Sequence, residues 1–208
     1  MKVLLVNGSG NLKGCTYTAL SEIARILELN GIHTEIFQIG AKPVRDCIGC
    51  CACRKNGGHC VFTEDSVNDF IDKAKEADGF IFGSPVYYAH PSGRLLSFMD
   101  RAFYANSAAF AFKPAAAIVS ARRAGTTASI DAITKHFTIN NMPVVSSNYW
   151  NMVHGNIPEE VMQDKEGLQI MRHLAMNMAW LLKCIEAGRI NGIERPVLEE
   201  KIRTNFIR

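Results

Sequence analysis

The sequence lacks several features that would place it in familiar classes. No apolar run approaches the ~18 residues that a membrane-spanning helix needs. The apolar part of the amino terminus is too short for a secretion signal, and no cleavage-like site follows it. The formal net charge is only +3, with both signs mixed along the chain, so no basic face for nucleic acid is indicated. We therefore expect a cytoplasmic protein that binds neither membranes nor nucleic acid.

The cysteines do not form the pattern of a disulfide scaffold. There are seven, an odd number, in a chain without a secretion signal. Reduced thiols or metal chemistry fit this usage better. Five of the seven fall within residues 47–60, whereas Cys184 lies in a late helical pattern and is predicted to be a core residue.

Apolar runs alternate with segments of helical periodicity along the chain. Strands are predicted at residues 2–6, 33–39, 79–83, 115–120 and 143–147, and helices at 16–30, 67–77, 92–104, 130–140 and 167–186. Strands that are apolar throughout indicate a parallel sheet covered on both faces. The pattern predicts a flavodoxin-like, doubly wound, five-stranded parallel sheet of order 2-1-3-4-5 in a three-layer α/β/α arrangement. Residues 1–187 would form this domain, with 47–60 as a cysteine-rich insertion and 188–208 as a tail.

The loop after the first strand has the composition of a phosphate cradle. "NGSGNLKGCTYTAL" combines three glycines with hydroxyl side chains at the start of a helix. Glycines let the backbone approach an anion, and the free amides of a helix N-terminus bind it. Ser9 and Thr16 add hydroxyl donors. Neither the Gly-Lys-Ser/Thr triplet nor the G-x-G-x-x-G spacing is present, and the alternative is a solvated turn that caps the helix.

A second loop, "GSPVYYAHPSG", follows the third strand. In the expected strand order this strand lies beside the first, so the two loops are neighbours. Ser84-Pro85 favours extended backbone, and two tyrosines follow. Such a loop suits a flat aromatic ring, although Tyr87 and Tyr88 alternatively pack against the next helix.

Together these segments resemble a known family. The order GSxxxxGxT, then "ADGFIFGSPVYY", then "GRLLSFMDR" resembles the NAD(P)H-dependent FMN reductase and iron–sulfur flavoprotein branch of the flavodoxin-like superfamily. The resemblance covers about residues 1–186. It implies that residues 1–187 bind FMN. It also implies a homodimer or homotetramer, since flavin sites in this group often lie at subunit interfaces.

The resemblance also implies site residues. The FMN phosphate would be held by Ser9, Leu12, Cys15 and Thr16, and the isoalloxazine ring by Pro85, Val86, Tyr87 and Tyr88. Cys15 departs from the family, which usually shows asparagine there. This departure changes one side-chain contact and leaves the backbone cradle intact.

A third loop, "SARRAGTT", follows the fourth strand and resembles the family's third flavin loop. Ser120 and Gly125 would face the pyrimidine edge of the flavin. Arg122 or Arg123 would place positive charge near N1 and O2, or would meet a phosphate of the nicotinamide donor. The alternative is a solvated pair of surface arginines. The loop Asn148–Asn156 covers the flavin, reaches a partner's site, or simply packs Trp150.

The cysteine segment "CIGCCACRKNGGHC" has the spacing C-x2-C-x2-C-x6-C when Cys51 is left out. Three closely spaced thiolates and a fourth from the next turn are typical of a 4Fe–4S cluster. The ligands would be Cys47, Cys50, Cys53 and Cys60, a spacing that resembles the compact motif of iron–sulfur flavoproteins. An ordered loop without metal, or a redox-active thiol pair, are the alternatives.

These features predict an FMN-dependent NAD(P)H oxidoreductase. Hydride would pass from nicotinamide to FMN, and electrons would pass on to a flavin, a quinone or a similar small-molecule acceptor. Solvent can supply protons, so no catalytic acid or base is assigned. A non-enzymatic electron-transfer iron–sulfur flavoprotein and a cofactor-free interaction module are the rival hypotheses.

Overall fold

The computed structural model describes residues 1–206, and its centre is a parallel sheet of order β2-β1-β3-β5-β6. The strands are β1 (Lys2–Asn7), β2 (His33–Gln38), β3 (Gly79–Tyr87), β4 (His90–Pro91), β5 (Ala115–Ala121) and β6 (Met152–His154). Only the two-residue β4 is antiparallel, and it pairs with the end of β3. With β4 left out, the sheet has the predicted strand order.

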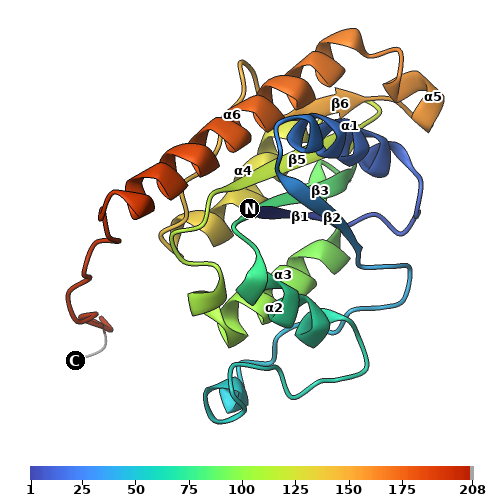
Figure 1. Cartoon of the computed structure of the whole chain (residues 1–208). Coiled ribbons are helices and arrows are strands. Elements are labelled where there is room, and N and C mark those ends of the chain that lie inside the picture. The colour runs from blue at the N-terminus through green and yellow to red at the C-terminus, as the bar shows by residue number, and fades with distance from the viewer. Residues whose placement is uncertain (207–208) are drawn as a thin grey trace.

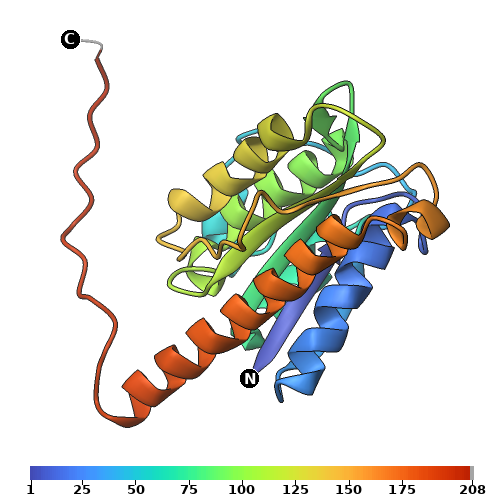
Figure 2. The same cartoon turned by 90° about the horizontal axis from the view of Figure 1, so that it is seen from above.

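Helices cover both faces of this sheet (Figure 1). The α-helices are α1 (Cys15–Leu29), α2 (Val67–Glu76), α3 (Gly93–Ala105), α4 (Thr126–Thr138), α5 (Pro158–Val161) and α6 (Lys165–Ile190), with short 3-10 turns η1 (Ala52–Lys55) and η2 (Ser107–Ala109). The α1 and α6 helices pack on one face, and α2, α3 and α4 pack on the other (Figure 2). The predicted three layers are therefore present.

The strands are buried because both of their faces meet helices. Val3 to Val6 of β1 are completely inaccessible to solvent, and all seven residues of β5 are buried. On the α2–α3–α4 face, phenylalanines from strands and helices form one cluster, in which the rings of Phe103 and Phe110 stack with their centroids 4.1 Å apart. Contacts between aromatic rings therefore form a large part of the core on this face.

The predicted fifth strand at residues 143–147 is wrong. This segment makes only one isolated bridge, between Val144 and Ala115, and the strand beside β5 is β6 (Met152–His154). Pro143 has no N–H to donate to a ladder, and Ser147 instead bonds to the Asn151 side chain within a loop. The loop rejoins the sheet where Asn151 Nδ2 donates to the Ala117 carbonyl at 3.1 Å.

Two helices are longer than their sequence patterns indicate. The α4 helix begins at Thr126 rather than Ile130, after Gly125 turns the chain with φ of +93°. The α6 helix runs from Lys165 to Ile190 rather than from 167 to 186, and Asp164 caps it by accepting from the Gly167 amide at 2.9 Å. Cys184 lies on the exposed side of α6, so its prediction as a core residue is wrong. None of the helices within residues 1–206 has the length and apolar character needed to cross a bilayer.

Lys113 makes the stability of the fold depend on pH. Its ammonium donates to the carbonyls of Ala74 and Lys75 at the end of α2, at 2.7 and 3.3 Å, and burial lowers the pKa of Lys113 to about 8. Below pH 8 the amine is charged in both states, and desolvation of that charge destabilises the fold. Between about pH 8 and 10.5 the folded state loses its proton first, so stability rises with pH across that window.

We expect the wild type to gain about 1 kcal/mol of unfolding free energy relative to Lys113→Met across this window, a value reduced because solvent screens the partly exposed amine. Urea denaturation of both proteins at several pH values measures it. A difference between the two proteins that is independent of pH would contradict this role of Lys113.

Candidate functional site

Three loops meet at the carboxyl edge of the sheet. Strand register places Asn7 beside Gly83, and Pro85 beside Ser120. The Gly8 amide donates to the Gly83 carbonyl at 2.8 Å, which joins the first loop to the second. The hydroxyls of Thr16 and Ser120 lie 2.8 Å apart, which joins the first loop to the third. The three predicted loops therefore form one site, as expected for a doubly wound sheet.

The first loop is held by two side chains that sequence reasoning missed. Asn7 is buried at the end of β1, and its carboxamide accepts from the Ser9 amide at 3.1 Å and donates to the side chain of Gln38. Gln38 Nε2 in turn donates to the Ser9 carbonyl at 2.7 Å. The Ser9 hydroxyl accepts from the Asn11 amide at 3.1 Å. Asn7 and Gln38 are polar residues that end the adjacent strands β1 and β2. This pattern was the signal in the sequence that could have revealed how the loop is held.

The loop leads into a helix N-terminus that the described side chains do not cap. Gly14 is the N-cap residue of α1 and brings no side chain, and no acidic residue occupies the first turn. The first amides of a helix have no intrahelical partner, and the helix dipole adds positive potential there. Burial raises the pKa of the Cys15 thiol, so the residue that departs from the family pattern stays neutral beside this potential.

A side chain is excluded at Gly8, where the first loop crosses the sheet edge, and Gly10 lies close to Arg94. A Cβ on Gly8 would lie 2.8 Å from the Gly83 carbonyl oxygen, and one on Gly10 would lie 3.1 Å from Arg94 Nη1. Arg94 reaches from α3 and also donates to the Ala41 carbonyl at 3.2 Å, so its guanidinium lies against the loop. A tight glycine turn, uncapped amides and a nearby cation fit the phosphate of a mononucleotide.

The second loop is a tight hairpin between β3 and β4. Tyr88 and Ala89 are its two central residues, with φ of +50° and +60°. Positive φ at both centres is the geometry of a type I′ turn, which is usually built from asparagine and glycine. Two residues with side chains in this conformation store strain, and such strain concentrates at functional sites. The side chain of Tyr88 is fully exposed, and that of Tyr87 is more than half exposed.

The third loop rests on this hairpin through Gly125. A Cβ on Gly125 would lie 2.3 Å from Ala89 Cα, so only glycine permits the contact. Arg122 and Arg123 are exposed, and the Arg123 carbonyl lies 3.2 Å from His154 Nε2 on β6. Tyr149 and Trp150 are also exposed, with ring centroids 4.6 Å apart, so Trp150 is not a core residue.

The predicted cofactor residues divide into two groups by exposure. Ser9, Thr16 and Ser120 are buried, and their hydroxyls bond within the protein, which indicates that they shape the loops. The exposed or partly exposed residues are Leu12, Cys15, Pro85, Val86, Tyr87, Tyr88, Arg122, Arg123 and Gly125. Solvent-facing groups of all three loops therefore surround the carboxyl edge.

The cysteine segment builds a separate pocket at the other end of α3. All five cysteines of residues 47–60 line a pocket of about 20 Å³, together with Arg101 and Tyr104. The segment is the cyan loop at the foot of Figure 1, under the end of α3. Because α3 has 13 residues, the pocket lies about 20 Å from the loop edge along the helix axis.

Arg101 is completely buried and fastens this segment to α3. Its Nε donates to Cys60 Sγ at 3.2 Å, its Nη2 to the Phe62 carbonyl at 3.0 Å, and its Nη1 to the Arg45 carbonyl and the Asp65 carboxylate. Burial alone would lower the pKa of Arg101, but the bonds to Asp65 and Cys60 outweigh it and raise the pKa. The guanidinium therefore stays charged and keeps positive charge against the Cys60 sulfur.

The thiols surround the pocket instead of converging on a point. Within residues 1–206, no three cysteine, histidine or acidic side chains are close enough to hold a single metal ion. A cluster of several irons needs thiolates around its edges, and five thiols around one pocket supply that donor type. Cys51 is set apart by a left-handed backbone, with φ of +56°, and its sulfur lies 3.7 Å from the Tyr104 hydroxyl.

Known proteins resemble the chain in sequence and in structure. An iron–sulfur flavoprotein of Methanocaldococcus jannaschii is 32% identical over 197 residues, which cover 89% of this chain and 100% of the relative. An iron–sulfur flavoprotein of Methanosarcina thermophila is 26% identical over 194 residues, which cover 91% of this chain and 99% of the relative. The crystal structure of a WrbA-like flavodoxin from Agrobacterium tumefaciens superposes with a TM-score of 0.61 at 17% identity. The superposition covers 88% of this chain and 96% of the flavodoxin.

The structural likeness confirms the predicted flavodoxin-like fold. The family described as NADPH-dependent FMN reductase matches residues 1–156, three quarters of the chain and all three loops of the site. The resemblance found in the sequence is thereby confirmed. This chain belongs to the NADPH-dependent FMN reductase family, and its relatives include iron–sulfur flavoproteins.

Proposed function

We propose that this protein is an FMN-dependent NAD(P)H oxidoreductase whose FMN lies across the three loops. The observation that carries the proposal is the uncapped N-terminus of α1 behind a glycine turn, with two further loops tied to that turn by hydrogen bonds. FMN, when bound, supplies the centre that accepts hydride from the nicotinamide. The protein contributes position, charge and exclusion of water.

Each loop has a distinct task in this proposal. The amides that follow Gly10, with Leu12 and Cys15 among them, hold the phosphate, while the bonds of Ser9 and Thr16 fix the loop's shape. The strained hairpin with Tyr87 and Tyr88 holds the ring system.

The third loop completes the site. Ser120 and Gly125 place its amides against the hairpin. Arg122 or Arg123, both exposed, supplies positive charge to the pyrimidine edge or to a nicotinamide phosphate. A small-molecule acceptor, such as a flavin or a quinone, then takes the electrons.

The test is anaerobic reduction of the FMN-loaded protein by NADH and NADPH, followed by flavin absorbance in a stopped-flow instrument. The proposal expects the flavin band to bleach with at least one nicotinamide. Bleaching by dithionite but by neither nicotinamide would overturn it and would leave the electron carrier as the better account.

The cysteine pocket supports a second role, that of an electron-transfer iron–sulfur flavoprotein. Cys47, Cys50, Cys53 and Cys60 would hold a 4Fe–4S cluster, and the Arg101 guanidinium lies against the Cys60 sulfur. Relatives named iron–sulfur flavoproteins cover most of the chain and support this role. The pocket and the flavin loops lie at opposite ends of α3, so each can be tested without removing the other.

The phosphate cradle makes a specific prediction at Leu12. Its side chain is exposed, so substitution does not disturb the core. Leu12→Asp places a carboxylate beside the bound phosphate, and we expect about a tenfold loss of FMN affinity from charge repulsion. Leu12→Asn is the matched control of the same size and should bind FMN as the wild type does. Calorimetric titration measures both, and equal losses in the two variants would contradict the placement of the phosphate.

The proposed cluster predicts that four of the five thiols are iron ligands and that Cys51 is not. Serine at Cys47, Cys50, Cys53 or Cys60 should remove most of the iron and sulfide taken up on anaerobic reconstitution, because each ligand is needed. Cys51→Ser and the distant Cys184→Ser should keep wild-type iron content. Iron retained in all of the first four variants, or no iron uptake by the wild type, would contradict the cluster. FMN binding should be unchanged throughout.

A further inference from the structure

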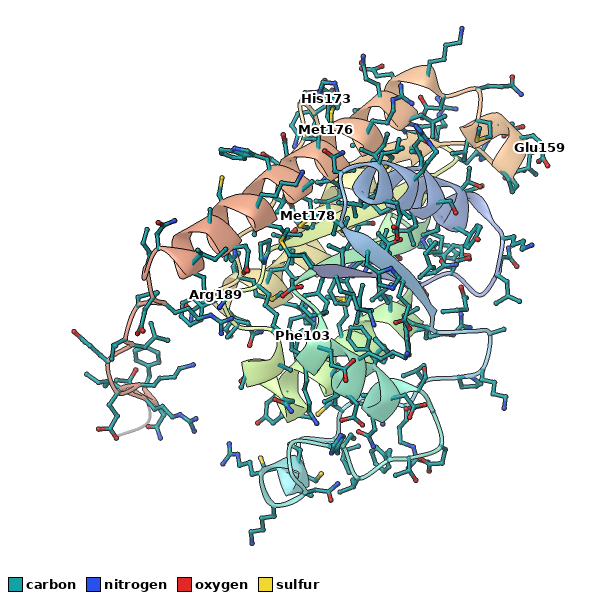
Figure 3. The ribbon with its side chains drawn as sticks, viewed as in Figure 1. Phe103, Glu159, His173, Met176, Met178 and Arg189 are labelled. Carbon is teal, nitrogen blue, oxygen red and sulfur yellow. The ribbon has the colours of Figure 1, made fainter. Side chains whose placement is uncertain are left out.

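The outer side of α6 carries an apolar stripe that no other element of the described chain covers. Met176, Trp180 and Cys184 recur every four residues and so share one side of the helix. Met176 is 45% exposed and Trp180 is 68% exposed. Figure 3 shows Met176 and His173 on the side of α6 away from the sheet, whereas Met178 points toward it. A large exposed tryptophan within an apolar row is typical of an interaction surface.

The segment after α6, which we call the C-terminal arm (residues 194–206), also exposes apolar side chains. Val197, Ile202 and Phe206 are 99%, 86% and 98% exposed. The arm has no helix or strand, and it stands clear of the domain in both views of the fold (Figures 1 and 2). Its one cationic contact with an aromatic ring of the domain is that of Arg195 with Phe112, at 6.0 Å.

The sequence of the arm has the pattern of an amphipathic helix that lacks a packing partner. Leu198, Ile202 and Phe206 are spaced by four and would lie on one helical face. Pro196 and the acidic pair Glu199 and Glu200 are the residue types that favour a helix start. A helix of this length is marginal in water unless its apolar face is packed against a surface. The arm therefore has the composition of a segment that folds on binding.

The chain leaves α6 through a defined turn, and the arm then stands clear of the helix (Figures 1 and 2). Gly192 has φ of +81°, its amide donates to the Arg189 carbonyl, and the Ile193 amide donates to the Gly188 carbonyl at 2.9 Å. These two bonds form a Schellman motif, which ends the helix and fixes the exit of the chain. Thirteen residues can span about 43 Å when extended, whereas the stripe is about 12 Å long, so one arm is long enough to cover one stripe.

We propose that the C-terminal arm docks on the α6 stripe of a second copy of this chain. The two copies exchange arms reciprocally, so each arm covers the partner's Trp180 and each stripe receives one arm. Such an exchange closes under two-fold symmetry and leaves neither arm nor stripe free for further growth. An arm that folds on its partner's helix face is the helix-in-groove mode of recognition. This interface uses neither the flavin loops nor the cysteine pocket.

Sedimentation velocity tests the exchange with the full chain, a chain truncated after Ile193, and Trp180→Lys. Truncation and Trp180→Lys should each remove one association step and halve the mass of the particle. Ile139→Lys, a change at an exposed apolar residue after α4, is the control that should keep the full mass. A mixture of the truncated chain, which keeps the stripe, with Trp180→Lys, which keeps the arm, should sediment faster than either alone.

Three results would overturn the proposal. The full chain could sediment as a monomer at every concentration. All four proteins could have the same mass, which would place any interface elsewhere. Truncation could instead shift the tryptophan fluorescence without a change of mass, which would show that the arm folds back on its own helix.

Discussion

Arg101→Met is expected to lower the free energy of unfolding by about 3–5 kcal/mol, because removing one partner of a buried ion pair leaves the other charge uncompensated. The stranded groups would be the Asp65 carboxylate and the carbonyls of Arg45 and Phe62. Domains of this kind are stable by about 5–15 kcal/mol, so the loss is a large part of the total. Urea denaturation measures it, and limited proteolysis should show the segment between Arg45 and Asp65 cut first.

Two further variants serve as controls, Arg101→Lys and the double variant Arg101→Met with Asp65→Leu. Lysine keeps the charge but has a single nitrogen in place of the fork that reaches Cys60, Arg45, Phe62 and Asp65, so it should recover only part of the stability. Adding Asp65→Leu to Arg101→Met removes the stranded carboxylate but also the acceptor of the Val67 amide, so it should restore part of the lost stability. A single methionine variant as stable as the wild type would show that Arg101 does not fasten the segment.

Gly125→Ala is expected to lower FMN affinity by about a hundredfold or more, equivalent to about 3 kcal/mol. The reason is geometric. The new Cβ would lie 2.3 Å from Ala89 Cα, so the third loop and the hairpin must separate. Both surfaces of the proposed ring site would move with them. Calorimetry with FMN measures the affinity, and thermal unfolding of the apoprotein measures the cost to the fold.

Gly31→Ala is the control that distinguishes the effect of backbone strain from the effect of the contact between Gly125 and Ala89. Gly31 also has a positive φ, of +77°, but a Cβ there meets nothing within 4 Å, and it lies between α1 and β2 at the opposite edge of the sheet. The left-handed conformation alone costs alanine about 1–2 kcal/mol of stability. Gly31→Ala should therefore lose stability and keep FMN affinity. Equal FMN affinity in both variants would contradict the role given to Gly125.

Much of the fold was predictable because local and global signals agree. Apolar strands alternating with helices determine a parallel sheet, and the predicted order matches the observed one once β4 is set aside. The fifth strand was misplaced because "PVVSS" has strand composition, while Pro143 and the loop bonds of Ser147 favour a detour before Met152. Cys184 was misassigned because an apolar helix pattern does not reveal which side of a long terminal helix faces solvent.

The sequence predicted which three loops form the site, but it did not predict the side-chain contacts that hold them. Loop composition located the glycine turn, the hairpin and the arginine loop, yet the bonds from Asn7 and Gln38 join strands 31 residues apart in sequence. The same limit applies to Arg94 and Arg101, which act from α3 on segments more than 35 residues earlier. The separation of the cysteine pocket from the flavin loops depends on the direction of α3, which spacing alone does not encode.

The central claim is that the first loop and the α1 amides grip the phosphate of FMN. Titrating the apoprotein in parallel with FMN and with riboflavin, which lacks the phosphate, tests it most directly. We expect FMN to bind at least about a hundredfold more tightly, since a phosphate held by several amides and a helix dipole contributes on the order of 3 kcal/mol. Equal affinity for the two flavins, or no heat with either, would contradict the claim.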